Sequence, residues 1–152
     1  MGPNPISVSA STMIGRLAAF ADAIFACNAR HVSKLLAQYV PTYQYEFNDP
    51  NPPLNHAPLS FPAGAYHTSE QQYLFDLSAL GFPELSTAQG QLSDAMVRYW
   101  THFARTGNPN SHGAPFWPPY GPSDQFQSLR EPAPAAATGF AVDHKCVIWG
   151  SP

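Results

Sequence analysis

The sequence predicts an incomplete α/β fold of helices plus one or two short strands. Two segments, 12–39 and 86–106, repeat apolar residues at intervals of three and four, the spacing of amphipathic helices. Segment 43–47 alternates large aromatic and polar residues, which is the period of a strand. Only 11% of the 152 residues are charged, against about 25% typically, so we expect faces that other parts of a larger domain cover.

In the first half of the chain, residues 1–11 predict an irregular lead-in without a core pattern. The helix over 12–39 is expected to place Leu17, Phe20, Ile24 and Cys27 on one apolar face and to end before Pro41. The strand at 43–47 follows. Prolines and asparagines between 49 and 61 then exclude regular structure, so the chain is expected to cross a surface as a loop.

In the second half, residues 69–75 predict one or two helical turns, with Thr68 or Ser69 as N-cap. Ser86 and Gln89 form a capping-box pattern at the start of the best helix, and Gly107 marks its end. Residues 126–129 resemble a strand weakly, 132–137 are of low complexity, and a short element is expected at 143–149. The apolar face of the best helix is expected to hold Leu92, Met96, Tyr99 or Trp100, and Phe103.

Composition argues against several functions. The net charge is −3 and the seven Lys and Arg residues are scattered, so we expect no nucleic-acid partner. The sequence contains no run of 18 apolar residues, so it predicts no membrane-spanning helix. The histidines at 56, 102 and 112 lack Cys or carboxylate partners at ligand spacing, and those at 31 and 144 are interpreted as structural. We therefore expect neither a metal nor another cofactor.

The two cysteines lie far apart, at Cys27 and Cys146. The sequence permits either two buried thiols or one long-range disulfide. Their spacing does not choose between these alternatives.

His67 is the candidate catalytic residue, because it lies on a turn of small residues just before an apolar run. A histidine on a loop at the edge of a packed scaffold is suited to general-base catalysis, but the chain contains no Gly-x-Ser-x-Gly nucleophile motif. The alternative is a turn histidine with no role in catalysis. Glu70, three residues further on, is interpreted as structural.

Several segments carry a family resemblance in a fixed order: 22–27, 43–47, 64–70 with 73–75, 99–110, 117–120 and 146–149. The most specific reads Trp100-Thr101-His102-Phe103-Ala104-Arg105-Thr106-Gly107-Asn108-Pro109-Asn110. Over about residues 12–149, the chain resembles the C-terminal portion of type-B carboxylesterases, the family of the α/β-hydrolase fold that includes the cholinesterases.

The resemblance implies that 43–47 is a late strand of the central sheet, and that 12–152 is the C-terminal segment of a single, incomplete carboxylesterase domain. It also implies that His67 is the triad histidine. Since chain order in this fold runs nucleophile, acid, histidine, the serine, the carboxylate and the oxyanion segment are expected upstream.

The expected function is therefore that of a C-terminal fragment of a serine esterase, inactive by itself, which leaves open whether the chain counts as an enzyme. Its expected partners are the missing N-terminal part of the domain and, in the complete enzyme, a small carboxylic ester. The family also contains catalytically dead adhesion proteins, so a non-catalytic interaction module is the alternative, and a shortened reading frame is a third reading.

In secreted members of the family, the positions of Cys27 and Cys146 form a disulfide. The resemblance thus favours the bridge over two thiols, and with it secretion or another oxidising compartment for the parent protein.

Overall fold

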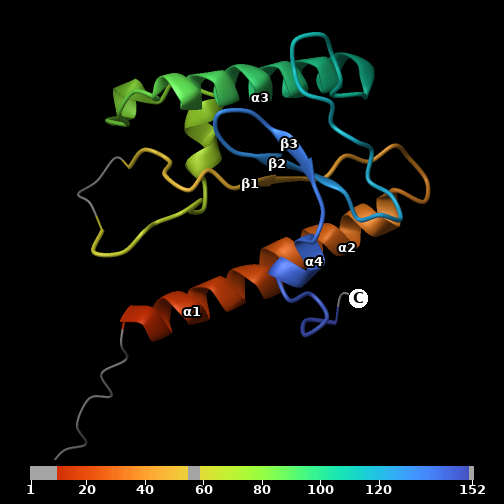
Figure 1. The fold of residues 1–152 in the computed structure, drawn as a ribbon, viewed down its shortest axis with the longest axis horizontal. Helices are drawn as coiled ribbons and strands as arrows, with labels where there is room; N and C mark the ends of the chain where they lie inside the picture. The colour runs from red at the N-terminus through yellow and green to blue at the C-terminus, as the bar shows by residue number, and fades with distance from the viewer. Residues whose placement is uncertain (1–9, 55–58, 151–152) are drawn as a thin grey trace, which may run out of the picture.

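The computed structural model describes residues 10–54 and 59–150, which form helices around a small sheet (Figure 1). A helical run opens the chain as α1 (Ala10–Ala21), a π-helical turn η1 (Asp22–Ala26) and α2 (Cys27–Leu36). Strand β1 (Tyr45–Phe47), two 3₁₀ turns, η2 (Ser69–Tyr73) and η3 (Ser78–Leu80), and the long helix α3 (Thr87–Thr106) follow. Strands β2 (Phe126–Leu129) and β3 (Ala135–Ala137) and helix α4 (Phe140–Asp143) complete the chain.

The three strands form one sheet in the order β1-β2-β3. Strand β1 pairs in parallel with β2, with Phe47 opposite Leu129, and β2 pairs antiparallel with β3. Helix α3 covers one face of this sheet, while α2 and α4 lie on the other side (Figure 1). The layers are thus helix, sheet and helix, as the predicted α/β class requires.

Most predicted elements are confirmed, with three corrections. The short element expected at 143–149 is instead α4, which covers Phe140–Asp143 and is followed by turns. The expected lead-in at 1–11 falls largely on residues 1–9, outside the described residues, and Ala10 and Ser11 already belong to α1. Strand β3 lies in the low-complexity segment and was not predicted. Its alanines have a weak strand preference, but pairing with β2 supplies the hydrogen bonds that local propensity does not.

The start and end of α3 follow the predicted capping chemistry. The Gln89 backbone N–H donates to Ser86 Oγ at 3.2 Å, and the Ser86 N–H donates to Gln89 Oε1 at 3.0 Å. The helix ends at Gly107, whose φ of 74° places it in the left-handed region that glycine adopts most readily. These local rules explain why this helix could be read from sequence.

The core lies between α3 and the sheet. Leu92 and Met96 are fully buried from the helix side, and Leu129 is fully buried from β2. Phe47 of β1 packs edge-on against Tyr73 of η2, with ring centroids 4.9 Å apart. The buried members of this cluster are Tyr73, Leu92, Ala95, Met96, Tyr99, Trp117 and Leu129.

The N-terminal helical run packs far less completely than α3. Leu17, Phe20 and Ile24 stand on its predicted apolar face, yet they are 64%, 59% and 50% exposed. Only Cys27 of that predicted face is buried. The periodicity therefore predicted the helix correctly, while the exposure of its apolar face depends on what packs there.

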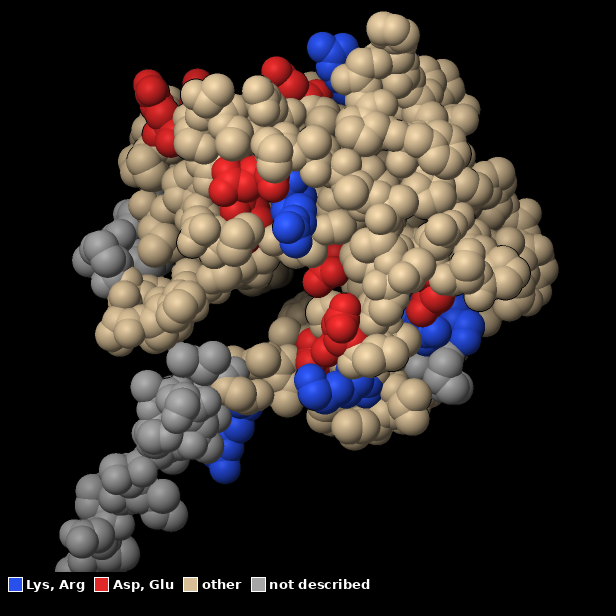
Figure 2. All heavy atoms as spheres, in the orientation of Figure 1, with Lys and Arg blue, Asp and Glu red and all other residues tan. Residues whose placement is uncertain are grey.

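The surface carries few charges, as the composition requires. Most atoms visible in Figure 2 belong to uncharged residues, and this face is hollowed between the N-terminal helix and the segment above it. Within the described ranges, no helix has the length and apolar character needed to cross a bilayer.

Candidate functional site

His67 lies on a tightly turned loop between the proline-rich segment and η2. The Tyr66 N–H donates to Gly64 O at 2.9 Å, and the Ser69 N–H donates to Tyr66 O at 3.0 Å. Gly64 has a φ of 59°, which a residue with a Cβ rarely adopts. The Tyr66 hydroxyl also donates to Pro53 O at 2.8 Å, so the backbone on either side of His67 is held in place.

Thr68 is one of the two residues expected to cap the helical turn after His67. It is the N-cap residue of η2, but its φ is 72° and its side chain makes no capping hydrogen bond. The predicted position of the N-cap is therefore confirmed, although the Thr68 side chain does not make the hydrogen bond that such a residue usually supplies. The left-handed backbone of Thr68 instead reverses the chain directly after His67.

The imidazole of His67 is exposed and, within the described residues, forms no hydrogen bond. Its neighbour is the ring of Phe25, with centroids 5.9 Å apart and 21° between the ring planes. Both ring nitrogens of His67 are therefore open to partners from outside the described residues.

A cavity of about 440 Å³ opens next to this pair of rings. Its walls come from η1, β1, the His67 loop and α4, including Phe25, Tyr45, Ala65 and Phe140. The structure thus brings together the motif at 22–27, the strand and the histidine turn, which are far apart in the sequence. The sequence did not show that these three segments meet.

Glu70 lies near Tyr45. Burial and, to a smaller extent, the Glu70 carboxylate raise the pKa of the Tyr45 hydroxyl. No hydrogen bond joins Glu70 to His67 in the part of the chain that the structure describes. Within the described residues, the histidine therefore has no carboxylate partner at hydrogen-bonding distance.

The loop that leads to His67 is anchored by a buried carboxylate at the end of β1. Asp49 is fully buried and accepts hydrogen bonds from the Tyr73 hydroxyl and from Gln89 Nε2, the latter at 3.2 Å. Burial, followed by the hydrogen bond to Asp49, raises the pKa of Tyr73. This network ties the loop to η2 and α3, and no sequence motif pointed to it.

His144 connects three segments below the sheet. Its Nδ1 is 2.7 Å from Asp22 Oδ1 of η1, and its Nε2 is 3.2 Å from Glu46 Oε1 of β1. Only the protonated imidazolium can donate to both carboxylates at once. The hydrogen bond to Glu46, reinforced by Asp22 and opposed by burial, raises the pKa of His144 to about 8.

Cys27 and Cys146 form a disulfide, the pairing that the resemblance implies. Their Cα atoms are 5.3 Å apart, and the exposed fractions of the two residues are 1% and 0%. The bridge closes a sequence separation of 119 residues next to His144. It joins the N-terminal helical run to the end of the chain.

Among the described residues, the remaining histidines do not form a second site. His102 Nδ1 donates to Asn108 O at 2.7 Å, which stabilises the turn after α3. His31 and His112 are exposed, while His56 lies outside the described residues. Among the residues that the structure describes, no three His, Cys, Asp or Glu side chains are grouped as a metal site would need.

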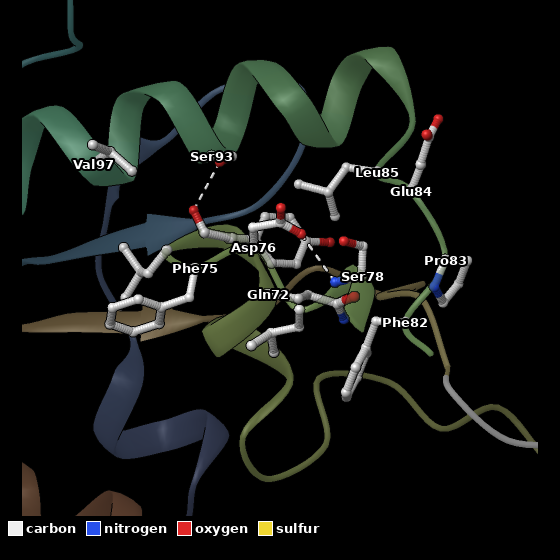
Figure 3. Close-up of a pocket in the computed structure, with 13 residues that line it drawn as sticks. Gln72, Phe75, Asp76, Ser78, Phe82, Pro83, Glu84, Leu85, Ser93 and Val97 are labelled. Atoms are coloured by element: carbon white, nitrogen blue, oxygen red, sulfur yellow. Dashed lines mark hydrogen bonds between the residues drawn. The ribbon is translucent and has the colours of Figure 1, made fainter. Parts of the chain in front are cut away.

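A second cavity, of about 330 Å³, lies between α3 and the 3₁₀ turns (Figure 3). The Ser78 N–H donates to Asp76 Oδ1 at 2.9 Å, and Ser93 Oγ donates to Tyr73 O at 2.7 Å. Hydrogen bonds from the Ser78 side chain and backbone lower the pKa of Asp76. Because these polar groups serve local structure and no residue of the His67 loop (64–68) lines it, this cavity is not the candidate site.

Comparison with known proteins identifies the family. The profile of the Carboxylesterase family matches residues 7–149, nearly the whole chain. The chain therefore belongs to the carboxylesterase family, and its segments 43–47, 64–70 and 99–110 are parts of a type-B carboxylesterase sequence.

Individual relatives are esterases or related hydrolases by name. Human carboxylesterase 3 is 37% identical over 113 residues, covering 66% of this chain and 18% of the relative. Human cocaine esterase is 33% identical over 132 residues, covering 85% of this chain and 23% of the relative. Acylcarnitine hydrolase of Rattus norvegicus is 30% identical over 134 residues, covering 84% of this chain and 22% of the relative.

A solved structure supports the fold. A PNB esterase superimposes with a TM-score of 0.69 and 22% sequence identity, covering 90% of this chain and 27% of that one. The three strands and their covering helices are thus part of an α/β-hydrolase fold. The chain spans about a fifth of the length of the curated relatives that it matches.

Proposed function

We propose that this chain supplies the C-terminal, histidine-bearing part of a carboxylic-ester hydrolase, with His67 as its catalytic base. The observation that carries the proposal is the His67 imidazole itself. It stands exposed on a backbone fixed from both sides, and its ring has no hydrogen-bond partner within the described residues. A fixed imidazole with both ring nitrogens unpaired can accept a hydrogen bond from a serine nucleophile and donate one to a carboxylate, both supplied by the rest of the domain.

In this role, His67 takes the proton of a serine hydroxyl as the serine attacks the ester carbonyl. The same imidazolium then donates the proton to the departing alcohol, and the cycle repeats with water to release the acid. The substrate class is a small carboxylic ester, as the names of the relatives suggest. The chain contains no Gly-x-Ser-x-Gly, so we expect it to be inert by itself.

The proposed partner is the N-terminal part of a carboxylesterase domain, and the open edge of β1 supports it. The Gln44 carbonyl accepts a hydrogen bond from β2 at 2.9 Å, and the Asn48 N–H donates to β2 at 3.0 Å. Because backbone groups alternate in direction along a strand, those of Tyr45 and Phe47 point to the other side, where β1 is the edge of the sheet that the described residues form. An unpaired edge of this kind can accept another strand.

An apolar hollow lies beside that edge, which adds to the case for a docking segment. Its volume is about 310 Å³ and its walls are largely aromatic, including Tyr43, Tyr45, Trp100 and Phe103. Together with the exposed face of α1, it leaves apolar surface for a partner to cover. The disulfide further favours an oxidising compartment, such as the secretory route, for the parent protein.

The test uses a chimera in which residues 12–149 replace the matching segment of human cocaine esterase. We expect the chimera to hydrolyse a small aryl acetate and the isolated chain not to exceed its own His67→Ala variant. In the chimera, His67→Ala should abolish turnover, whereas His112→Ala, at another exposed histidine, should not. A chimera that folds and stays active without His67 would overturn the proposal.

A further inference from the structure

The π-helical turn η1 is held at both ends by residues from the far end of the chain. At its start, Asp22 Oδ1 lies 2.7 Å from His144 Nδ1. At its end, Cys27 is bonded to Cys146. The Cys27 backbone N–H bonds to Asp22 O, five residues back, which closes the turn and fixes the residues between.

Phe25 stands between these two anchors and faces His67. The two rings are nearly parallel, with 21° between their planes and 5.9 Å between their centroids. Phe25 is 57% exposed and is not part of the buried core cluster, so core packing does not account for a large aromatic ring here. Its one aromatic contact in the described structure is the His67 imidazole.

We infer that Phe25 is a positioning residue for His67, held by the anchored π turn so that its ring fixes the orientation of the imidazole. The inference rests on the proposed role of His67 as a base. A ring stacked on one side restricts rotation of the imidazole, so its nitrogens stay directed at their partners. The negative face of the phenyl ring also favours the imidazolium that forms during proton transfer.

The stacking is tested first on the chain itself, by acylating its histidines with dilute diethyl pyrocarbonate and following each site by peptide mass spectrometry. Phe25→Leu keeps an apolar side chain without the ring, and Phe25→Tyr keeps the ring. We expect His67 to react about twofold or more faster in Phe25→Leu and at the parent rate in Phe25→Tyr. Exposed His112, far from Phe25 in sequence, is the internal reference.

The anchors give a second, independent variant. Asp22→Asn removes the charge that faces His144, so it should loosen the turn. We therefore expect His67 to react faster in Asp22→Asn than in the parent chain, as in Phe25→Leu. Equal His67 rates in the parent, Phe25→Leu and Asp22→Asn chains would overturn the inference, provided that far-UV circular dichroism shows all three folded.

The catalytic consequence is measured in the cocaine esterase chimera. Phe25→Leu should lower kcat about 2- to 10-fold with KM within about twofold, the range that an aromatic pair implies, and Phe25→Tyr should restore kcat. If His67→Ala abolishes activity but Phe25→Leu matches the parent, the inference fails while the proposed function stands. If His67→Ala remains active, the proposed function fails irrespective of Phe25.

Discussion

The two long helical regions of this chain differ in how they are stabilised. Helix α3 buries Leu92 and Met96 against the sheet and carries its own capping box. The N-terminal run of α1, η1 and α2 leaves most of its apolar face exposed, and is attached through the disulfide and a few polar contacts. One region is stabilised by packing within the chain, and the other by discrete cross-links.

This contrast matters for function because the two regions meet at His67. The loop that leads to His67 is joined to α3 by the hydrogen bond between Asp49 and Gln89, while the ring stacked on His67 is that of Phe25 in η1. The proposed site therefore depends on the well-packed and on the cross-linked half together.

Breaking the disulfide should have the largest effect. Removing a cross-link that closes a loop of more than 100 residues costs about 4–5 kcal/mol of unfolding free energy in the chain-entropy model. We expect a Cys27→Ser, Cys146→Ser double variant to lose protease resistance first in the N-terminal run and later in α3. Dithiothreitol should reproduce this in the parent and do nothing to the double variant.

Simultaneous cleavage of both regions would contradict the distinction between them. It would show that the N-terminal run is part of one cooperative unit with the α3 core.

Matched truncations of two leucines compare the regions directly. Leu92→Ala, in the centre of the core, should lower the unfolding free energy by about 2–5 kcal/mol. Leu17→Ala, at a position 64% exposed, should change it by less than about 0.5 kcal/mol. Urea denaturation followed by tryptophan fluorescence measures both, and equal losses would mean that α1 is packed more tightly than its exposure indicates.

The smallest effect is a pH dependence at the His144 junction. Since its folded pKa of about 8 exceeds the ordinary value of 6.5, the imidazolium contributes stability that is fully present below pH 6.5 and is lost as pH rises through 8. The shift corresponds to about 1–2 kcal/mol after allowing for partial exposure.

Urea denaturation from pH 6 to 9 measures this junction. A His144→Gln variant is the control, and it should show a smaller decline over that interval because its side chain does not titrate. If the unfolding free energies of the two proteins change with pH in parallel, the His144 contacts to η1 and β1 do not contribute the expected stability.

The sequence predicted those features that local chemistry determines. Ser86, Gln89 and Gly107 delimit α3 through their own side chains and backbone preferences, and alternation identified β1. Strand β3 was missed because its alanines pair only when β2 lies beside them. The exposure of the apolar face of α1 could not be predicted from its periodicity, because periodicity indicates a helix but not its neighbours.

The candidate site shows the same division. His67 and the cysteine pair were found through short motifs that the family resemblance gave a meaning. The stacking of Phe25 on His67 and the links from His144 to Asp22 and Glu46 join residues from distant parts of the chain. No local pattern encodes such contacts, since they arise only when the chain has folded.

The central claim is that His67 transfers the proton in ester hydrolysis. Its most direct test is kcat of the cocaine esterase chimera with His67→Gly, measured with and without added imidazole. We predict a loss of at least about 10⁴-fold, partly restored by imidazole in a concentration-dependent manner. A folded His67→Gly chimera with kcat within tenfold of the parent, and no response to imidazole, would contradict the claim.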